Sequence, residues 1–190
     1  MSKTWLYADP HFGHGNICKF TREDGSPLRP WDDSGQMTED LINWYNELVD
    51  DGDRVYILGD VAMNRRGLDM SVPRLKGRKV LVKGNHDIDK LSYYSKYFDD
   101  IRAYVCKKGF ILSHIPIHPG SLARWSINIH GHLHANKVTK TVEIVQEVGR
   151  NPKKHLVEEP DPRYRCVSVE LTDYRPILLD QVLEEAGIKT

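Results

Sequence analysis

The stretch RKVLVKGNHD, residues 78–87, leads from a short apolar run directly into a polar turn. The apolar run is rich in valine and leucine, which is typical of a strand buried inside a sheet. Glycine and asparagine tolerate the backbone conformations of tight turns, so GNHD alone has an ordinary explanation. The stretch becomes informative because four other segments of the chain repeat its plan.

Each of these four segments is a short apolar run that ends in aspartate or histidine. They are TWLYADPH (4–11), RVYILGD (54–60), GFILSH (109–114) and SINIHGHLH (126–134). In open α/β sheets the ligand site lies beyond the carboxyl ends of the strands. If the five strands share a direction, their polar ends therefore meet at one rim. One such cluster is commonly a turn or a satisfied histidine, whereas five in one chain indicate a site.

Helix-like segments separate the strands, and this alternation predicts an α/β protein. The segment 38–51 has a helical apolar stripe with Thr38 as a plausible N-cap, and 87–98 and 178–187 also read as helices. Two stretches rich in turn-forming residues read as irregular: a possible cap loop at 21–36 and an excursion at 149–164. We expect one domain that spans residues 1–190.

The overall composition limits the possible functions. Hydrophobic residues make up 39% of the 190-residue chain, charged residues make up 28%, and the formal net charge is zero. A neutral chain gives no general electrostatic attraction for nucleic acid or anionic membranes. We find no membrane-spanning apolar run, no signal peptide and no paired cysteines, so a cytoplasmic protein with reduced thiols is the simplest expectation.

The strand ends offer Asp, Asn and His without Cys, a ligand set that suits Mn, Fe, Zn or Co better than copper(I) or an iron–sulfur cluster. His132 and His134 are two residues apart, so on an extended strand both could face one metal. There are too many candidate ligands for one ion, but they would fill two sites if one carboxylate bridges. The candidates are Asp9, His11, Asp60, Asn85, His114, His132 and His134.

A charge count indicates the substrate. Two divalent cations bring four positive charges, and Asp9, Asp60 and a bridging hydroxide together remove three. The centre stays positive, as an anionic substrate requires. Two metals about 3.5–4 Å apart clamp the attacking and leaving oxygens of an in-line displacement and generate hydroxide near neutral pH. The natural substrate class is a phosphate ester.

The order of motifs D-x-H, G-D, G-N-H-[DE], a lone His and G-H-x-H resembles the calcineurin-like metallophosphoesterase superfamily. The closing segment CVSVELTDYRPILLDQV (166–182) also resembles the last strands of small bacterial and phage members. The resemblance implies an α/β fold, a four-layer α-β-β-α sandwich of two mixed sheets flanked by helices. It also implies a metal-dependent phosphoric ester hydrolase.

The resemblance assigns the candidate ligands to two divalent ions, Mn²⁺ first, with Fe, Zn, Co and Ni as alternatives. It implies that the first ion is held by Asp9, His11 and His134, that the second is held by Asn85, His114 and His132, and that Asp60 bridges them. His86 would face the substrate and protonate the leaving oxygen or stabilise the phosphoryl charge. General acid help of this kind contributes about 10²–10⁴-fold.

One departure from the family pattern argues against protein phosphatase activity. Many phosphoprotein phosphatases have GDxxDRG, whose second Asp orients the GNH histidine, but Met63 occupies that place in GDVAMNRRG (59–67). Either Asn64 or Asp87 holds the imidazole of His86 instead, or no residue does, and both are also candidate substrate contacts. Further candidate substrate contacts are His14, Arg65 and His118.

The loop 21–36 could cap the pocket, with Lys19, Arg22, Arg29 and Trp31 available for phosphate or base contact. The expected partner is a small phosphorylated substrate or a nucleotide, with no membrane and no dedicated nucleic-acid-binding domain. Two alternatives to a monoesterase stay open: a phosphodiesterase or nucleotide phosphohydrolase, and a non-catalytic metal-binding scaffold on the same fold.

Overall fold

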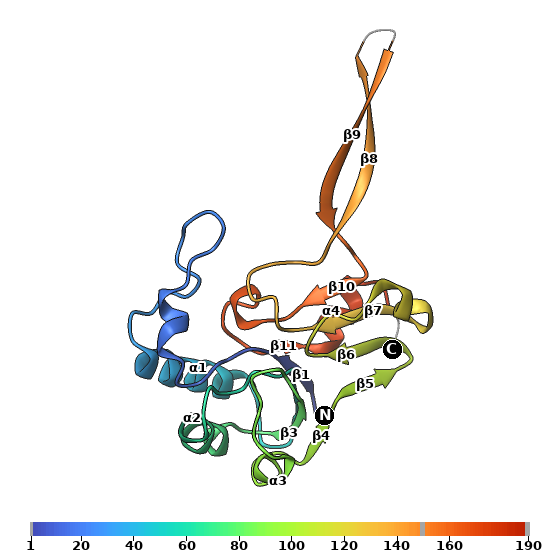
Figure 1. Ribbon diagram of the computed structural model, residues 1–190. Coiled ribbons are helices and arrows are strands. Elements are labelled where there is room, and N and C mark those ends of the chain that lie inside the picture. The colour runs from blue at the N-terminus through green and yellow to red at the C-terminus, as the bar shows by residue number, and fades with distance from the viewer. Residues whose placement is uncertain (1, 149–150, 189–190) are drawn as a thin grey trace.

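The computed structural model describes residues 2–148 and 151–188. Five strands form the first sheet, in the order β11-β1-β2-β3-β4 (Figure 1). They are β1 (Thr4–Tyr7), β2 (Arg54–Ile57), β3 (Arg78–Val82), β4 (Asp100–Arg102) and β11 (Ile177–Leu178). Strands β1 to β4 are parallel to one another, and β11 is antiparallel to β1. The three expected strands of this sheet therefore share one direction.

Four strands form the second sheet, in the order β10-β7-β6-β5. They are β5 (Tyr104–Lys107), β6 (Gly109–Ser113), β7 (Trp125–His130) and β10 (Tyr164–Cys166). Strands β6, β7 and β10 are parallel, and β5 is antiparallel to β6. Both sheets are thus mixed, and the two strands that end in His114 and in the GHLH segment are parallel neighbours.

Alternation along the strands places one set of side chains between the two sheets. Leu6 and Val80 of the first sheet belong to one buried cluster with Leu112 and Ile129 of the second. The intervening residues of the first sheet, such as Tyr7, belong to the other cluster, on the opposite face. Burying each large aliphatic side chain of this kind contributes about 1.5–3 kcal/mol.

Helices cover the outer face of the first sheet. They are α1 (Ser34–Leu48), α2 (Arg65–Ser71) with the short η2 (Val72–Arg74), and α3 (Leu91–Tyr94). Helix α1 buries Met37, Leu41, Ile42 and Tyr45 in the cluster that contains Tyr7. Helix α4 (Leu179–Glu185) packs beside β1 and β11, and η3 (Pro119–Arg124) contacts β7. The expected α/β sandwich of two mixed sheets flanked by helices is confirmed.

Helix α1 begins four residues before the expected N-cap. Asp33 caps it, because its side chain accepts a hydrogen bond from the amide of Gln36 at 2.8 Å. Thr38 lies inside the helix, where its hydroxyl donates to the carbonyl of Ser34 at 2.7 Å. The prediction of a Thr38 cap was wrong because the serine and glycine before it were assigned to the loop.

The other helix predictions succeed in part. Within 87–98 only Leu91–Tyr94 is α-helical, whereas α4 matches the prediction for 178–187 well. Gly187 has φ 69°, the left-handed conformation of a residue that follows a helix.

The excursion predicted at 149–164 is largely regular. Residues 149 and 150 lie outside the described residues, but β9 (Asn151–Pro160) pairs along its length with β8 (Thr139–Val148). The two strands project from the rest of the fold as an antiparallel ribbon (Figure 1). Pro152 and Pro160 lie near and at the ends of β9, where a missing N–H is tolerated in an edge strand. The prolines were therefore misread as strand breakers.

The expected cap loop 21–36 is irregular up to Asp33, after the short helix η1 (Gly15–Lys19). Trp31 is buried, and its indole N–H donates to Asp40 at 2.7 Å while its ring packs against Trp44 and Tyr174. Trp31 is therefore not available for base contact, contrary to expectation. Among the described residues, no helix is both long and apolar enough to cross a membrane.

Candidate metal centre

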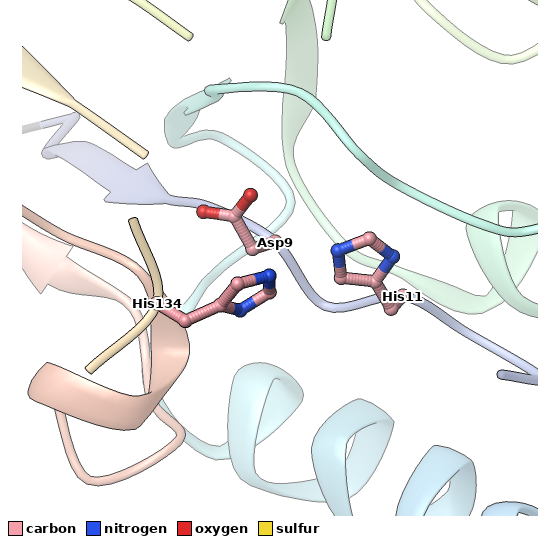
Figure 2. A group of neighbouring side chains, drawn as sticks. All are labelled: Asp9, His11 and His134. Atoms are coloured by element: carbon pink, nitrogen blue, oxygen red, sulfur yellow. The ribbon is translucent and has the colours of Figure 1, made fainter. Parts of the chain in front are cut away.

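The polar ends of the strands meet at one rim of the two sheets. Asp9 and His11 follow β1, and His134 reaches them from the segment after β7 (Figure 2). In this first group, one possible ligand atom from each residue lies within 4.8 Å of the other two. Asp60, His114 and His132 form a second group by the same measure. These two groups are the arrangement that the sequence motifs predict.

Asp60 lies between the two groups. Its Oδ2 is 3.7 Å from Nε2 of His11 in the first group and 3.4 Å from Nε2 of His114 in the second. The amide oxygen of Asn85 lies 2.8 Å from the same His114 nitrogen. All seven predicted ligands are thus brought together, with one carboxylate placed to be shared.

The split of the GHLH histidines corrects one interpretation. His132 belongs to the Asp60 group and His134 to the Asp9 group, so they do not face one metal. Strand β7 ends at His130, and both histidines have positive φ, 70° at His132 and 51° at His134. The prediction assumed extended backbone, in which alternate side chains share a face.

Backbone strain is concentrated at this centre. In the described part of the chain seven non-glycine residues have positive φ, and five of them belong to the two groups. Such conformations cost of order 1–3 kcal/mol each and persist where the surrounding structure enforces them, often at functional sites. The five are Asp9, His11, Asp60, His132 and His134.

Glycines at two motif positions allow the close approach. A Cβ built at Gly84 would clash with Oδ1 of Asp60, and one built at Gly131 would clash with Oδ2 of Asp9. The glycines of the GNH and GHxH motifs are therefore required by the crowding of the two carboxylates.

The electrostatics distinguish the two carboxylates. Burial raises the pKa of Asp9 to about 6. Burial also acts to raise the pKa of Asp60, but the hydrogen bond and charge of His114 outweigh it and lower that pKa to about 2. Burial lowers the pKa of His11 to about 3, which keeps the imidazole neutral and able to bind a metal.

The donor set fits metal ions. Within the described part of the chain, both ring nitrogens of the buried His11 lack a hydrogen-bond partner, which is uncommon for buried polar atoms. Asp9 is fully buried, and a buried carboxylate is normally paired with a cation. Carboxylates with imidazoles suit divalent transition metals. The two groups could therefore each hold a metal ion.

Three residues that complete the centre were not predicted in these roles. Glu170 Oε1 lies 3.1 Å from Nδ1 of His134, which leaves Nε2 of that ring for a metal. The Ser168 hydroxyl donates to Asp9 Oδ2 at 2.7 Å. Both belong to RCVSVEL, where polar residues alternate with buried valines. This alternation was the available signal.

Arg29 is the third of these residues, and its role differs from the expected one. It is buried, its guanidinium donates to the carbonyls of Asp9 and Pro10, and it pairs with Glu170 at 2.7 Å. Arg29 therefore fixes the segment that presents the first ligands and is not exposed to contact a substrate.

Neither residue proposed to hold the His86 imidazole does so. Asp87 is fully buried and accepts hydrogen bonds from the amides of Asp60, Val61 and Gly84. Asn64 caps α2 by accepting from the amide of Gly67 at 2.9 Å. Both side chains stabilise the loops that bear the ligands. Asp87 is too deeply buried to touch a substrate, whereas a substrate contact of the exposed Asn64 stays a prediction.

The remaining candidates lie in different places. The His14 ring lies 5.5 Å from the ring of His11, so His14 borders the first group. Arg65 is exposed and pairs with Asp89 at 2.8 Å, in the loop that follows His86. His118 is exposed and caps η3 by accepting from the amide of Gly120 at 3.1 Å. The role of His118 as a substrate contact stays a prediction.

Comparison with known proteins gives relatives of this chain. No family model matches it. The uncharacterized protein MJ1445 from Methanocaldococcus jannaschii is 31% identical over 187 residues, which cover 97% of this chain and 91% of MJ1445. The crystal structure of the protein of unknown function AQ665 from Aquifex aeolicus shares the fold. Its TM-score is 0.63 at 24% identity, with 97% of this chain and 100% of that chain covered. The chain therefore belongs to the same protein family as MJ1445.

Proposed function

We propose that this protein is a dinuclear metal-dependent phosphoesterase of the calcineurin-like metallophosphoesterase type. The position of Asp60 is the observation that supports this most. Its Oδ2 lies within 4 Å of a histidine from each group, at 3.7 Å from His11 and 3.4 Å from His114. A carboxylate shared in this way is what two adjacent ions require, whereas a single structural site would be closed by its own ligands.

Two bound divalent ions would supply a nucleophile from water near neutral pH and neutralise the charge of the phosphoryl oxygens. The chain's own residues determine the charge of the site. Asp9 and Asp60 contribute two negative charges, and the imidazoles and the Asn85 amide contribute none. With two ions bound, the centre remains positive and attracts an anionic ester.

His86 is the residue best placed to assist the leaving group. It is exposed at the mouth of the centre, and its backbone amide donates to Oδ1 of Asp60 at 2.8 Å. Its ring centroid lies 5.6 Å from that of His11. The backbone hydrogen bond fixes the loop, and the exposed imidazole can give a proton to the departing oxygen.

The test uses chelator-treated protein reloaded with Mn²⁺ and assayed on p-nitrophenyl phosphate and bis-p-nitrophenyl phosphate. We expect metal-dependent turnover, and we expect His86→Ala to lower it about 10²–10⁴-fold with bound metal unchanged. His155→Ala, at an exposed position of the β8–β9 ribbon, is the matched control. Full activity of His86→Ala would reject its role. Metal binding without turnover of either ester or of a nucleotide panel would favour the non-catalytic scaffold.

A groove beside the centre favours a diester or a nucleotide over a small monoester. Its volume is about 600 Å³, and it runs from His132 and His134 to Lys19, Phe20 and Arg22 at the cap loop. Phe20 is 50% exposed, as a platform for a base would be. Lysine and arginine are the usual partners of phosphate oxygens.

The groove assignment is tested by measuring kcat/KM for three substrates: a nucleotide, bis-p-nitrophenyl phosphate and p-nitrophenyl phosphate. The values for the first two are each divided by the value for p-nitrophenyl phosphate. Stacking of a base on an aromatic side chain contributes about 1–3 kcal/mol, so Phe20→Ala should lower the nucleotide ratio by at least fivefold. Tyr104→Ala, an exposed aromatic on β5, is the control. An unchanged ratio in Phe20→Ala would show that the groove does not bind the base of a nucleotide substrate.

A further inference from the structure

The ribbon of β8 and β9 forms a two-stranded sheet of its own. Its strands pair from Thr139 with Pro160 to Val148 with Asn151, and the ribbon projects away from both larger sheets (Figure 1). An isolated two-stranded hairpin is at best marginally stable in water, and its edges present unpaired N–H and C=O groups. This ribbon therefore has backbone groups available for another strand.

The ribbon also exposes apolar side chains. Leu156 of β9 is 73% exposed, and Ile144 and Val145 of β8 are 48% and 53% exposed. Val145 and Leu156 lie on one face of the ribbon, and Ile144 lies on the other. Exposed apolar residues that share a face are typical of an interaction site. Leu156 lies near the middle of β9. A second strand paired with the edge of β9 that faces away from β8 would cover it.

In β9, the charged residues at equal distances before and after Leu156 have opposite signs. Residues 152–160 read PKKHLVEEP, with basic residues before the leucine, acidic residues after it, and a proline four positions away on each side. Side chains two apart on a strand share a face, so Lys154, Leu156 and Glu158 lie on one face. The strand is thus complementary in charge to an antiparallel copy of itself.

We propose that two copies of this chain associate by antiparallel pairing of their β9 edges, centred on Leu156. A two-fold axis perpendicular to the ribbon then places Leu156 opposite Leu156 of the second copy. Lys154 lies opposite Glu158 of the second copy, and Glu158 opposite its Lys154. The result is a four-stranded sheet with an apolar centre and two symmetric ion pairs, an isologous interface.

Both charged side chains are exposed, although each has a contact within its own chain. Glu158 accepts a hydrogen bond from the Thr141 hydroxyl, which leaves its second carboxylate oxygen for another partner. Lys154 pairs with Glu143 across the ribbon at 2.8 Å, but the two side chains are 68% and 47% exposed. Exposed pairs of this kind contribute little, so a cross-copy pair can form beside it. The prolines lie near or at the ends of β9 and leave residues 153–159 between them for pairing.

A second copy fits these observations better than an unrelated partner. A strand from another protein would need acidic residues opposite Lys154 and basic residues opposite Glu158, but it would place no symmetry requirement on β9 itself. Pairing of two identical β9 strands requires opposite charges at equal distances on the two sides of its centre. The sequence of β9 meets this requirement about Leu156. This inference does not depend on the phosphoesterase proposal.

The test is light scattering coupled to gel filtration on the full chain at increasing concentration. We expect wild type to reach twice the chain mass of 21.9 kDa. Lys154→Glu and Glu158→Lys should each give monomers, because each places like charges opposite one another. Mixing the two variants should restore a one-to-one dimer, since both opposed pairs then have opposite charges.

Two charge reversals elsewhere, Lys108→Glu in the β5–β6 turn and Glu184→Lys in α4, serve as controls and should stay dimeric. Restoration on mixing also shows that the single variants are folded. Monomeric wild type at every concentration would overturn the proposal. So would dimers that persist in both single variants, or single variants that stay monomeric when mixed.

Discussion

Asp9 is fully buried and accepts hydrogen bonds from the Ser168 hydroxyl and the His132 amide. Its pKa is nevertheless raised, because burial penalises the charged form more than these contacts and the neighbouring histidines favour it. Without a bound cation, the charged Asp9 side chain therefore lowers the stability of the folded protein. If Asp9 binds a metal as proposed, metal binding is gained there at a cost in the stability of the metal-free protein.

Asp9→Asn should stabilise the metal-free protein above pH 6 and abolish metal binding in the first group. A carboxyl whose folded pKa is raised from 3.8 to about 6 contributes its stability below pH 3.8 and loses it as pH rises through about 6. The rise corresponds to about 3 kcal/mol at most. Urea unfolding with chelator measures the gain, and Asp51→Asn, on an exposed turn, is the control. A less stable Asp9→Asn would contradict the argument.

Glu170 positions His134, so Glu170→Gln should weaken metal binding. Carboxylates that hold a metal-binding histidine typically contribute 10–100-fold in affinity. Competition with a fluorescent Mn²⁺ chelator measures the change, with the exposed Glu47→Gln as the control. If Glu170→Gln binds Mn²⁺ as tightly as wild type, the Glu170–His134 contact does not orient the ring.

Glu170→Gln should also change the pH dependence of stability. Burial acts to raise the pKa of Glu170, but Arg29 and His134 outweigh it and lower that pKa from 4.5 to about 2. A lowered carboxyl pKa stabilises the fold above pH 4.5, and this contribution is lost as pH falls toward 2. The gap in free energy of unfolding between chelated wild type and variant should be widest near neutral pH and narrow in acid. A gap independent of pH would contradict this assignment.

At the scale of elements, local sequence patterns predicted five of the eleven described strands, but they gave no sign of the long-range contacts. Apolar runs that end in Asp, Asn or His marked β1, β2, β3, β6 and β7. Arg29 and Glu170 are 141 residues apart, so no local pattern joins them, and Arg29 looked like a free loop residue. The β8–β9 ribbon was missed because prolines were taken to exclude a strand.

The start of α1 gives a test at this scale. Asp33→Ala should destabilise the protein by about 0.5–2 kcal/mol, because it leaves the Gln36 amide without its capping acceptor. Asp32→Ala, at the exposed neighbouring position, is the matched control and should change stability by much less. Urea unfolding measures both. Equal effects of the two substitutions would show that Asp33 does not cap the helix.

At the scale of the whole molecule, two mixed sheets face each other so that ligands from both meet at one rim. The first sheet supplies Asp9, His11, Asp60 and Asn85, and the second supplies His114, His132 and His134. Metal ions would therefore join the two sheets at this rim. The motifs predicted which ligand residues meet. The buried residues that hold these ligands, such as Arg29 and Glu170, come from segments far apart in the sequence, so no local motif predicted them.

The central claim is that two ions, sharing Asp60, hydrolyse a phosphate ester. The most direct measurement is a titration of Mn²⁺ into chelator-treated protein, with bound Mn²⁺ counted and release of p-nitrophenol followed at each step. We predict that turnover appears as the second ion binds and reaches its maximum at two ions per chain. Two bound ions without hydrolysis of either p-nitrophenyl ester, or full turnover with one, would contradict the account.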